Sequence, residues 1–378
     1  MNSTQNTLPT KTVGFIVNPV AGMGGAVGLK GTDGKEILNQ AIALGARPIA
    51  SQRAETFLTG LIPVIKNLNL IVGIGDMGQN QAEKCGFTYK VLGETKKETT
   101  SEDTQIIAKA IVEAGVDLLV YCGGDGTTRD ILKSVGLHVP VLGVPTGVKM
   151  HSAVFAVSPQ AAARVSVTYL WGSLPLREAE VMDVDEEEFR QGHLSAELYG
   201  YLLSPFEPHL IQGNKMASPM TENEVENQAA IAIYAIEEMK TKIIYIVGPG
   251  TTTRTIGDLL DQKKTLLGVD IFQEKKIVAK DVNEKQILET INGKYAKIIV
   301  TPIGGQGFIF GRGNQQISSK VIHQVGLENI VVVATKSKLD RLESLRVDTG
   351  DLELDEHFRV RGIRVIVDYK ISKEMNIE

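Results

Sequence analysis

The stretch that decides the fold, "LVYCGGDGTTRD" at residues 119–130, passes from a run of apolar residues into a turn with three glycines. The apolar part is typical of a buried strand, and the polar part predicts the start of a helix, which Thr127 and Thr128 would cap. Glycines at the end of a strand let backbone N–H groups converge on an anion. Asp125 adds a carboxylate, which can hold Mg²⁺ against phosphate oxygens or accept a hydroxyl proton, unless it is a simple turn residue.

Around this stretch, short apolar runs alternate with amphipathic helical segments. The alternation runs from residue 12 to residue 172 and is typical of right-handed βαβ crossovers. It predicts an α/β fold whose N-terminal domain, residues 10–172, contains a Rossmann-like parallel sheet that carries the glycine turn.

The remaining residues, 173–378, predict a C-terminal domain of different construction. Alternating apolar and polar residues on both sides of a charged turn predict a β-hairpin over 177–205, and the acidic run 183–188 is expected to be its solvated tip. Strand and helix signals then alternate again over 220–350, which predicts a second α/β domain. A terminal strand is expected over 358–371, and the sequence leaves open which domain it joins.

The overall composition limits the classes of function. The chain has 378 residues and a formal net charge of −5, and it has no dense Lys/Arg run, so a nucleic-acid partner is not expected. No stretch approaches the roughly 20 apolar residues of a membrane span, which favours a cytoplasmic protein without a membrane partner. The two cysteines, Cys85 and Cys122, lie on different elements, and Cys122 is interpreted as a small buried residue.

Four glycine-rich turns follow apolar runs, at residues 18–25, 73–78, 122–130 and 247–254. Because ligands of open α/β sheets bind at the carboxyl ends of the strands, several such turns indicate a polyphosphate ligand. The alternative for each is a tight chain reversal. No G-x-x-x-x-G-K-[ST] motif is present, so a P-loop ATPase is disfavoured.

The second half has two candidate phosphate sites of its own. Gly250, Thr251 and Thr252 stand at an expected helix start after a Gly-Pro-Gly turn, which is a favourable place for an anion. Arg312 and Asn314 lie among glycines in "TPIGGQGFIFGRGNQQIS", residues 301–318, where a guanidinium could clamp a phosphate. A tight turn with a helix cap is the alternative reading of both.

The glycine turns carry a family resemblance. Residues 123–127, "GGDGT", resemble the signature of the ATP-NAD kinase superfamily, which also includes diacylglycerol and sphingosine kinases. Asn18-Pro19 with its glycine-rich loop resembles the first phosphate-binding turn of that superfamily, and "GVPTGVKMHSAVFA", residues 143–156, resembles its next block. The closer likeness is to the AcoX-like branch.

The resemblance implies roles for individual residues. Asp125 would be the catalytic carboxylate and a metal ligand. Residues implied to bind the nucleotide phosphates are Asn18, Gly22, Gly24, Gly25, Gly123, Gly124, Gly126, Thr127 and Thr128. Residues implied to line the substrate cleft are Thr146, Gly147, Lys149, His151 and Ser152. For Lys149 and His151, a solvated or capping side chain is the alternative.

These features together predict a phosphotransferase that uses Mg²⁺ and transfers a phosphoryl group from ATP or polyphosphate to a hydroxyl group. The 2′-hydroxyl of the adenosine ribose of NAD is the first choice of acceptor. Familiar NAD kinases grip the dinucleotide with an Asn-Glu pair, which has no clean counterpart within the expected cleft of this chain. Their second domain is a β-sandwich, whereas the second half of this chain predicts an α/β domain. A kinase for a small polyol, sugar phosphate or acetoin-related metabolite, or a non-catalytic nucleotide sensor, is therefore the alternative. The family also suggests a homo-oligomer.

Overall fold

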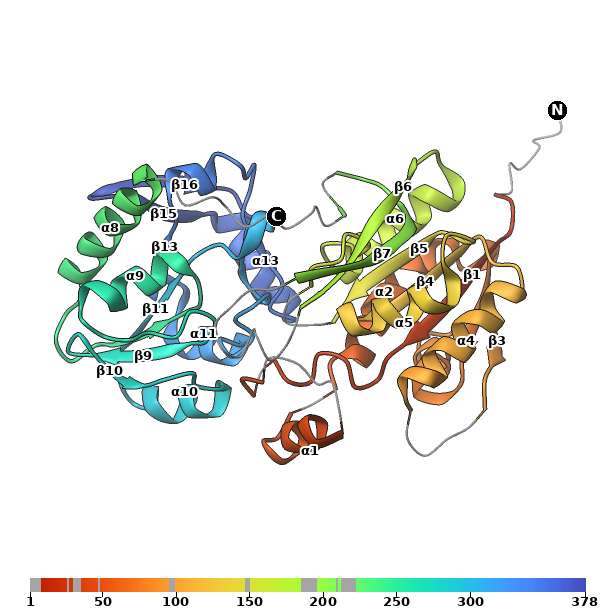
Figure 1. The fold of residues 1–378 in the computed structure, drawn as a ribbon, viewed down its shortest axis with the longest axis horizontal. Coiled ribbons are helices and arrows are strands. Elements are labelled where there is room, and N and C mark those ends of the chain that lie inside the picture. Colours follow the sequence, from red (N-terminus) through yellow and green to blue (C-terminus); the bar gives the residue numbers. More distant parts are fainter. Residues whose placement is uncertain are drawn as a thin grey trace. The chain divides into compact units, whose positions relative to one another are not determined.

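The computed structural model divides into two compact units, each with its own sheet (Figure 1). The first unit comprises Met1–Met23, Thr32–Leu38 and Arg47–Asn214, and the second comprises Gly24–Gly31, Asn39–Ala46 and Lys215–Glu378. The residues that the structure describes are 8–25, 27–29, 35–46, 48–94, 99–146, 150–184, 196–208, 210–211 and 222–378.

The first unit is built on a parallel sheet with the strand order β3-β2-β1-β4-β5. Its strands are β1 (Lys11–Val17), β2 (Leu68–Gly73), β3 (Tyr89–Leu92), β4 (Leu118–Gly123) and β5 (Val141–Pro145). All of β4 is buried, as is most of β1, because helices cover both faces of the sheet. The parallel sheet predicted from the sequence is confirmed.

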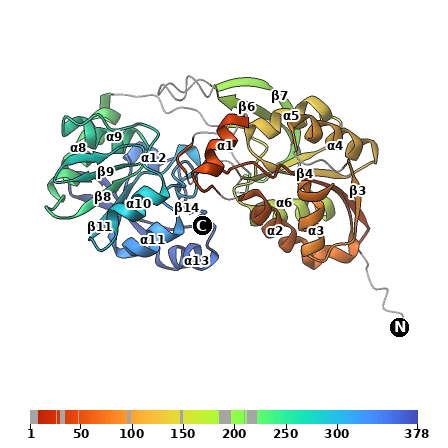
Figure 2. The same cartoon turned by 90° about the horizontal axis from the view of Figure 1, so that it is seen from below.

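The helices of the first unit are α2 (Ala50–Leu61), α3 (Gln79–Lys84), α4 (Ser101–Glu113), α5 (Asp125–Val135) and α6 (Pro159–Trp171), with the 3₁₀ turns η1 (Ile62–Asn67) and η2 (Gly75–Met77). The pair α4 and α5 packs on one face, whereas α2 and α6 pack on the other (Figure 2). Helix α4 begins at a capping box, in which Thr100 and Asp103 satisfy each other's backbone N–H groups. Another helix, α1 (Lys35–Ala43), spans segments of both units.

The expected hairpin is present as β6 (Leu176–Val184) and β7 (Ala196–Pro205), which pair antiparallel. It packs against α5 and β5, and its Ala179, Val181 and Leu202 are buried in the core of the first unit. The hairpin therefore belongs structurally to the first unit, although the sequence grouped it with the C-terminal part. Most of the predicted acidic tip lies outside the described residues.

The second unit contains a seven-stranded mixed sheet with the order β10-β9-β8-β11-β13-β15-β16. Its strands are β8 (Ile244–Val247), β9 (Asp270–Gln273), β10 (Lys276–Ala279), β11 (Ala296–Val300), β13 (Ile330–Val333), β15 (Ile363–Asp368) and β16 (Ile371–Met375), and a small sheet pairs β12 (Phe308–Phe310) with β14 (Arg346–Val347). Strands β8, β11, β13 and β15 run parallel. The second α/β architecture is thus confirmed.

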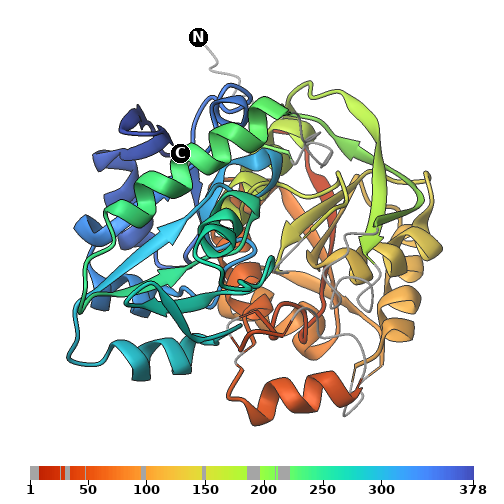
Figure 3. The same cartoon turned by 60° about the vertical axis from the view of Figure 1, so that its left-hand side comes forward.

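Helices cover both faces of this second sheet. They are α8 (Glu222–Glu237), α9 (Thr251–Leu259), α10 (Glu284–Ile291), α11 (Ser319–Val325), α12 (Lys336–Leu339) and α13 (Leu352–Arg361), with the 3₁₀ turns η3 (Gly304–Gln306) and η4 (Leu327–Asn329). Alternate residues of β8 enter different cores: Ile246 packs with α10 and α11, and Val247 packs with α8 and α9. Helix α8 is the long green helix that crosses this unit in Figure 3.

The terminal segment joins the second sheet, but it differs from the single strand expected over 358–371. Helix α13 continues to Arg361, and Gly362, with φ of +65°, ends it. Strand β15 then pairs with β13, and β16 pairs with β15 as the edge strand. Among the described helices, none has the length and apolar character required to cross a membrane.

Candidate functional site

Three turns meet at the carboxyl ends of β1, β4 and β5, which are neighbours in the first sheet. The first turn follows β1, the second follows β4 and the third follows β5. Asn18, directly after β1, joins two of them: its backbone N–H donates to the Cys122 carbonyl at 2.9 Å, and its Nδ2 donates to Thr127 Oγ1 at 2.9 Å. Its Oδ1 accepts from the backbone N–H of Val20 at 3.2 Å. The conformation of the first turn is therefore fixed by the side chain that leads into it.

Gly22 brings the first turn against the third. Its φ is +78°, and a Cβ at this position would lie 1.9 Å from the carbonyl oxygen of Thr146. Thr146 in turn donates its backbone N–H to the Gly123 carbonyl at 3.1 Å. Its Oγ1 is buried, and within the described residues it has no hydrogen-bond partner. Only glycine permits this approach of the first turn to the third.

Asp125 is the first residue of α5, and its side chain is almost completely buried, with 6% exposed. Its Oδ2 accepts from the backbone N–H of His151 at 2.6 Å, and its Oδ1 accepts from that of Ser152 at 3.0 Å. The amino end of a helix favours a negative charge, and these charge-assisted hydrogen bonds stabilise it further. Asp125 therefore fixes the segment that follows β5 to the start of α5.

The same segment is tied to the hairpin. The Ser152 hydroxyl donates to the Met182 carbonyl at 2.9 Å and accepts from the Met182 N–H at 3.0 Å. One turn into α5, Arg129 forms a salt bridge of 2.7 Å with Asp183 and lies over the ring of Tyr199 at 4.4 Å. Hairpin, segment and helix therefore form one connected support around Asp125.

A buried hydroxyl pair lies beneath the second turn. Thr128 Oγ1 lies 2.5 Å from the hydroxyl oxygen of Tyr121 and donates to the Gly124 carbonyl at 3.0 Å. Burial raises the pKa of Tyr121 well above its usual value and also raises the pKa of the Cys122 thiol. Both groups are therefore neutral near pH 7, in agreement with the interpretation of Cys122 as a buried structural residue.

The predicted capping role of Thr127 and Thr128 is wrong. Helix α5 begins at Asp125, earlier than expected, with Gly124 as its N-cap and no side-chain cap hydrogen bond. Both threonines therefore lie in the first turn of the helix, where Thr127 accepts from Asn18. The helix begins earlier than expected because the negative charge of Asp125 is favourable at the first position of a helix.

Replacing Tyr121 with phenylalanine is expected to lower the free energy of unfolding by about 1 kcal/mol, because the Thr128 hydroxyl loses its buried partner. Urea denaturation of both proteins measures the difference. Tyr295→Phe serves as the control, since Tyr295 is 86% exposed and should be neutral. Equal stabilities of Tyr121→Phe and the native protein would show that this hydroxyl pair contributes nothing.

Mg²⁺ was expected at Asp125, and the residues present fit this ion only together with phosphate oxygens. No group of three or more His, Cys, Asp or Glu side chains gathers around a point in the described parts of the chain. Asp125 offers one carboxylate, whose two oxygens accept from the backbone N–H groups of His151 and Ser152. Mg²⁺ in phosphate sites commonly takes one or two carboxylates plus phosphates and water.

The structure brings most of the predicted first-unit residues together. They are Asn18, Gly22, Gly123, Gly124, Asp125, Gly126, Thr127, Thr128, Thr146, His151 and Ser152. Gly24 and Gly25 belong to the segment Gly24–Gly31, which is grouped with the second unit. Gly147 and Lys149 lie outside the described residues.

The predicted residues of the second half lie in the second unit. Gly250, with φ of +127°, is the N-cap of α9, so Thr251 and Thr252 begin that helix as expected. Arg312, however, lies 3.9 Å from Asp348 and 4.7 Å from the ring centroid of Phe308. A carboxylate therefore lies near its guanidinium, and the phosphate contact expected of Arg312 stays a prediction.

Sequence reasoning missed two groups near Asp125 and one pocket. Tyr121 was seen only as part of a strand, and Arg129 only as part of the quoted stretch, because their partners Thr128 and Asp183 are recognised only in the fold.

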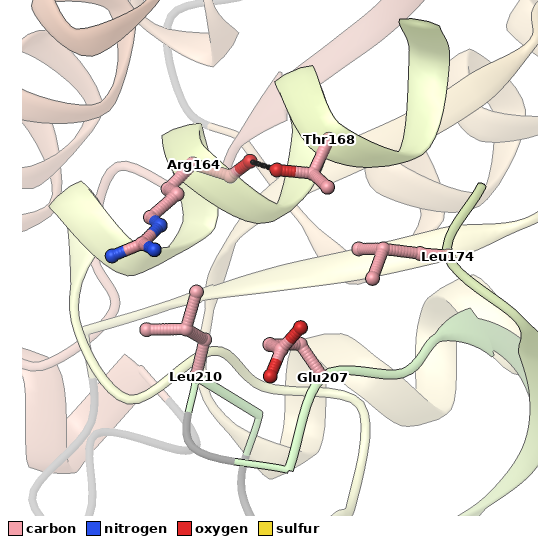
Figure 4. A pocket seen from close by; sticks show the side chains of 5 residues that line it. All are labelled: Arg164, Thr168, Leu174, Glu207 and Leu210. Carbon is pink, nitrogen blue, oxygen red and sulfur yellow. Dashed lines mark hydrogen bonds between the residues drawn. The ribbon is translucent and has the colours of Figure 1, made fainter. Parts of the chain in front are cut away.

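A pocket of about 190 Å³ lies beside α6 (Figure 4). It is lined by Arg164, Thr168, Leu174, Glu207 and Leu210. No sequence motif pointed to it.

Comparisons with known proteins agree with the sequence motifs. The family model for the ATP-NAD kinase N-terminal domain matches residues 13–172, and the model for the ATP-NAD kinase C-terminal domain matches residues 240–372. Together they cover more than half of the chain. A search of curated proteins gave no match.

Similarity to solved structures is low. Two Bacillus anthracis str. Sterne proteins described as diacylglycerol kinases are 14% and 15% identical, with TM-scores of 0.25 and 0.22. The alignments cover 47% and 48% of both chains, so the chain spans about half the length of these relatives. The substrate-binding protein LivJ of a branched-chain amino acid transporter from Streptococcus pneumoniae is 10% identical, with 88% of this chain and 67% of LivJ covered and a TM-score of 0.25.

Proposed function

Because this chain belongs to the ATP-NAD kinase family, we propose that it transfers a phosphoryl group from ATP, or from polyphosphate, to a hydroxyl group. The observation that supports this most is the position of Asp125. Its carboxylate stands at the amino end of α5, where the turns after β1, β4 and β5 meet. The amino end of a helix and one carboxylate thus lie at the same edge of the sheet.

The three turns bind and orient the donor. The first turn of α5 offers backbone N–H groups to the phosphates, and Asn18 holds Thr127 at the start of that helix. Thr146 Oγ1, which is buried without a partner in the described structure, supplies a further hydroxyl. Phosphoryl transfer depends mainly on positioning and charge neutralisation, so this rigid framework is suited to it.

Asp125 acts on the acceptor. Its carboxylate accepts the proton of the acceptor hydroxyl while that oxygen forms a bond to the γ-phosphorus, and the bond from phosphorus to the bridging oxygen breaks to release ADP. The hydrogen bonds from His151 and Ser152 hold the carboxylate in one orientation. Mg²⁺, bound by phosphate oxygens with Asp125 as a protein ligand, would neutralise the charge of the donor.

We propose the 2′-hydroxyl of the adenosine ribose of NAD as the acceptor. This choice follows the family, whose models match both parts of the chain. A smaller polyol or sugar phosphate is the second candidate, favoured by the differences from familiar NAD kinases: no clean counterpart of their Asn-Glu pair in the expected cleft, and an α/β second unit.

An acceptor panel tests this proposal. Purified protein is incubated with Mg²⁺, ATP or polyphosphate, and NAD, NADH, ribitol or ribose 5-phosphate, and products are identified by mass spectrometry. We expect NAD to gain one phosphate, and samples with ADP as donor or with EDTA serve as controls. A phosphorylated polyol without phosphorylated NAD would establish the second candidate. ATP binding without any product would contradict a phosphotransferase and favour a nucleotide sensor.

A further inference from the structure

The pocket beside α6 lies in the first unit, between that helix and the turn that follows β7 (Figure 4). Arg164 and Thr168 line it from α6, about one helical turn apart, and Leu174 lines it from the segment after that helix. Glu207 and Leu210 line the other side, and their side chains point towards α6. The pocket shares no lining residue with the three turns at the carboxyl ends of β1, β4 and β5.

Backbone hydrogen bonds hold the wall of the pocket that faces α6. The N–H of Leu210 donates to the Glu207 carbonyl at 3.1 Å and closes the turn that carries both residues. The N–H of Val157, just before α6, donates to the Leu210 carbonyl at 2.8 Å, and the N–H of Phe206 donates to the Pro175 carbonyl at 2.9 Å. The turn is thus joined to the segments on both sides of α6. Because these walls have a defined position without a ligand, binding requires little ordering of the chain.

The pocket presents two opposite charges that do not pair with each other. Arg164 contributes a guanidinium and Glu207 a carboxylate. Within the described parts of the chain, neither side chain forms an ion pair or a side-chain hydrogen bond. The two charged ends therefore stand apart, with the space of the pocket beside them. A ligand that carries one charge of each sign can contact both.

The other lining residues determine what else the ligand must contain. Thr168 Oγ1 donates its proton to the Arg164 carbonyl at 2.9 Å, so its oxygen remains as an acceptor. It can accept from an ammonium group, but it cannot donate to a carboxylate at the same time. Leu174 and Leu210 add apolar surface, which favours an alkyl group. A simple anion such as phosphate would be attracted by Arg164 but repelled by Glu207.

A free α-amino acid with a small aliphatic side chain has all of these groups. We propose that the pocket binds such a molecule, with its carboxylate on Arg164, its ammonium on Glu207 and Thr168, and its alkyl group against Leu174 and Leu210. The volume of about 190 Å³ agrees with this size, because a cavity of about 150 Å³ holds benzene and valine is only slightly larger. The site lies in the first unit alone, and its occupation does not depend on phosphoryl transfer.

Saturation-transfer difference NMR on the full chain, without ATP or Mg²⁺, tests this binding. The probes are L-valine, isobutylamine, which lacks the carboxylate, and 3-methylbutanoate, which lacks the ammonium group. Because the charges of the pocket are partly solvated, we expect valine to bind with a dissociation constant of about 1 mM. Each analogue should bind about tenfold more weakly. The proposal is overturned if valine does not bind at about 10 mM, or if either analogue binds as tightly as valine.

Arg164→Gln and Glu207→Gln locate the ligand. Each should weaken valine binding about tenfold. Arg164→Gln should leave the affinity for isobutylamine unchanged, and Glu207→Gln should leave that for 3-methylbutanoate unchanged, because each analogue lacks the group that the altered residue contacts. The control is Lys109→Gln, which removes an exposed charge from α4 on the other face of the sheet and should alter no affinity. Unchanged valine binding in both variants, or an equal loss for all three probes, overturns the proposal.

Discussion

Asp125→Asn is expected to stop phosphoryl transfer and to weaken the fold at the same time. An amide at this position must direct its NH₂ group at the backbone N–H of either His151 or Ser152, so one hydrogen bond becomes a contact between two donors. A lost buried partner costs about 1–3 kcal/mol of stability. The amide also cannot accept the acceptor proton, which lowers turnover by about 10²- to 10⁴-fold. Single-turnover kinetics and urea denaturation measure the two effects.

Ser152→Ala separates the chemical role of Asp125 from its supporting role. This variant keeps the Ser152 N–H that binds Asp125 but loses the hydroxyl that pairs with Met182. We expect a loss of stability similar to that of Asp125→Asn and a much smaller loss of turnover. If both variants lose turnover in proportion to stability, the carboxylate only holds the segment in place, and its proposed role as a base is wrong.

The supporting role of Asp125 was not accessible from the sequence. The apolar runs that became β1, β4 and β5 were recognisable because both faces of a parallel sheet are buried. The partners of Asp125, however, lie 26 and 27 positions along the chain. The return of the segment after β5 to the start of α5 is a tertiary feature, and no local pattern specifies it. The sequence therefore predicted a carboxylate at a turn but not its buried contacts.

The second unit shows the same division between local and tertiary information. Strands β8 and β11 and the start of α9 follow from apolar runs and a Gly-Pro-Gly turn. Arg312 was read as a phosphate clamp because its neighbours are glycines. The sequence did not indicate its neighbour Asp348, which follows the short strand β14, whose pairing with β12 has no signal in the sequence. Which carboxylate lies beside a given arginine can be seen only in the folded structure when the two residues are far apart in the sequence.

Gly22→Ala is expected to have the second large effect, on both stability and nucleotide affinity. At φ of +78° an alanine costs about 1–2 kcal/mol in backbone strain. In addition, its Cβ would lie 1.9 Å from the Thr146 carbonyl oxygen, so the first and third turns must move apart. Because those turns are proposed to bind the donor, ATP should bind at least about tenfold more weakly, equivalent to about 1.4 kcal/mol.

Gly115→Ala isolates the steric part of this effect. Gly115 has nearly the same φ, +77°, but no atom lies within 4 Å of a Cβ placed there. It should lose only the stability due to backbone strain and bind ATP normally, whereas Gly22→Ala should lose more stability and also affinity. Urea denaturation and calorimetric titration of ATP compare the two variants. Because the two backbones are nearly equally strained, any difference measures the contacts of the new Cβ, which would lie 1.9 Å from the Thr146 carbonyl oxygen and 2.7 Å from Ile49 Cδ1. Equal behaviour would mean that the turns separate without cost, and their convergence would then not explain donor binding.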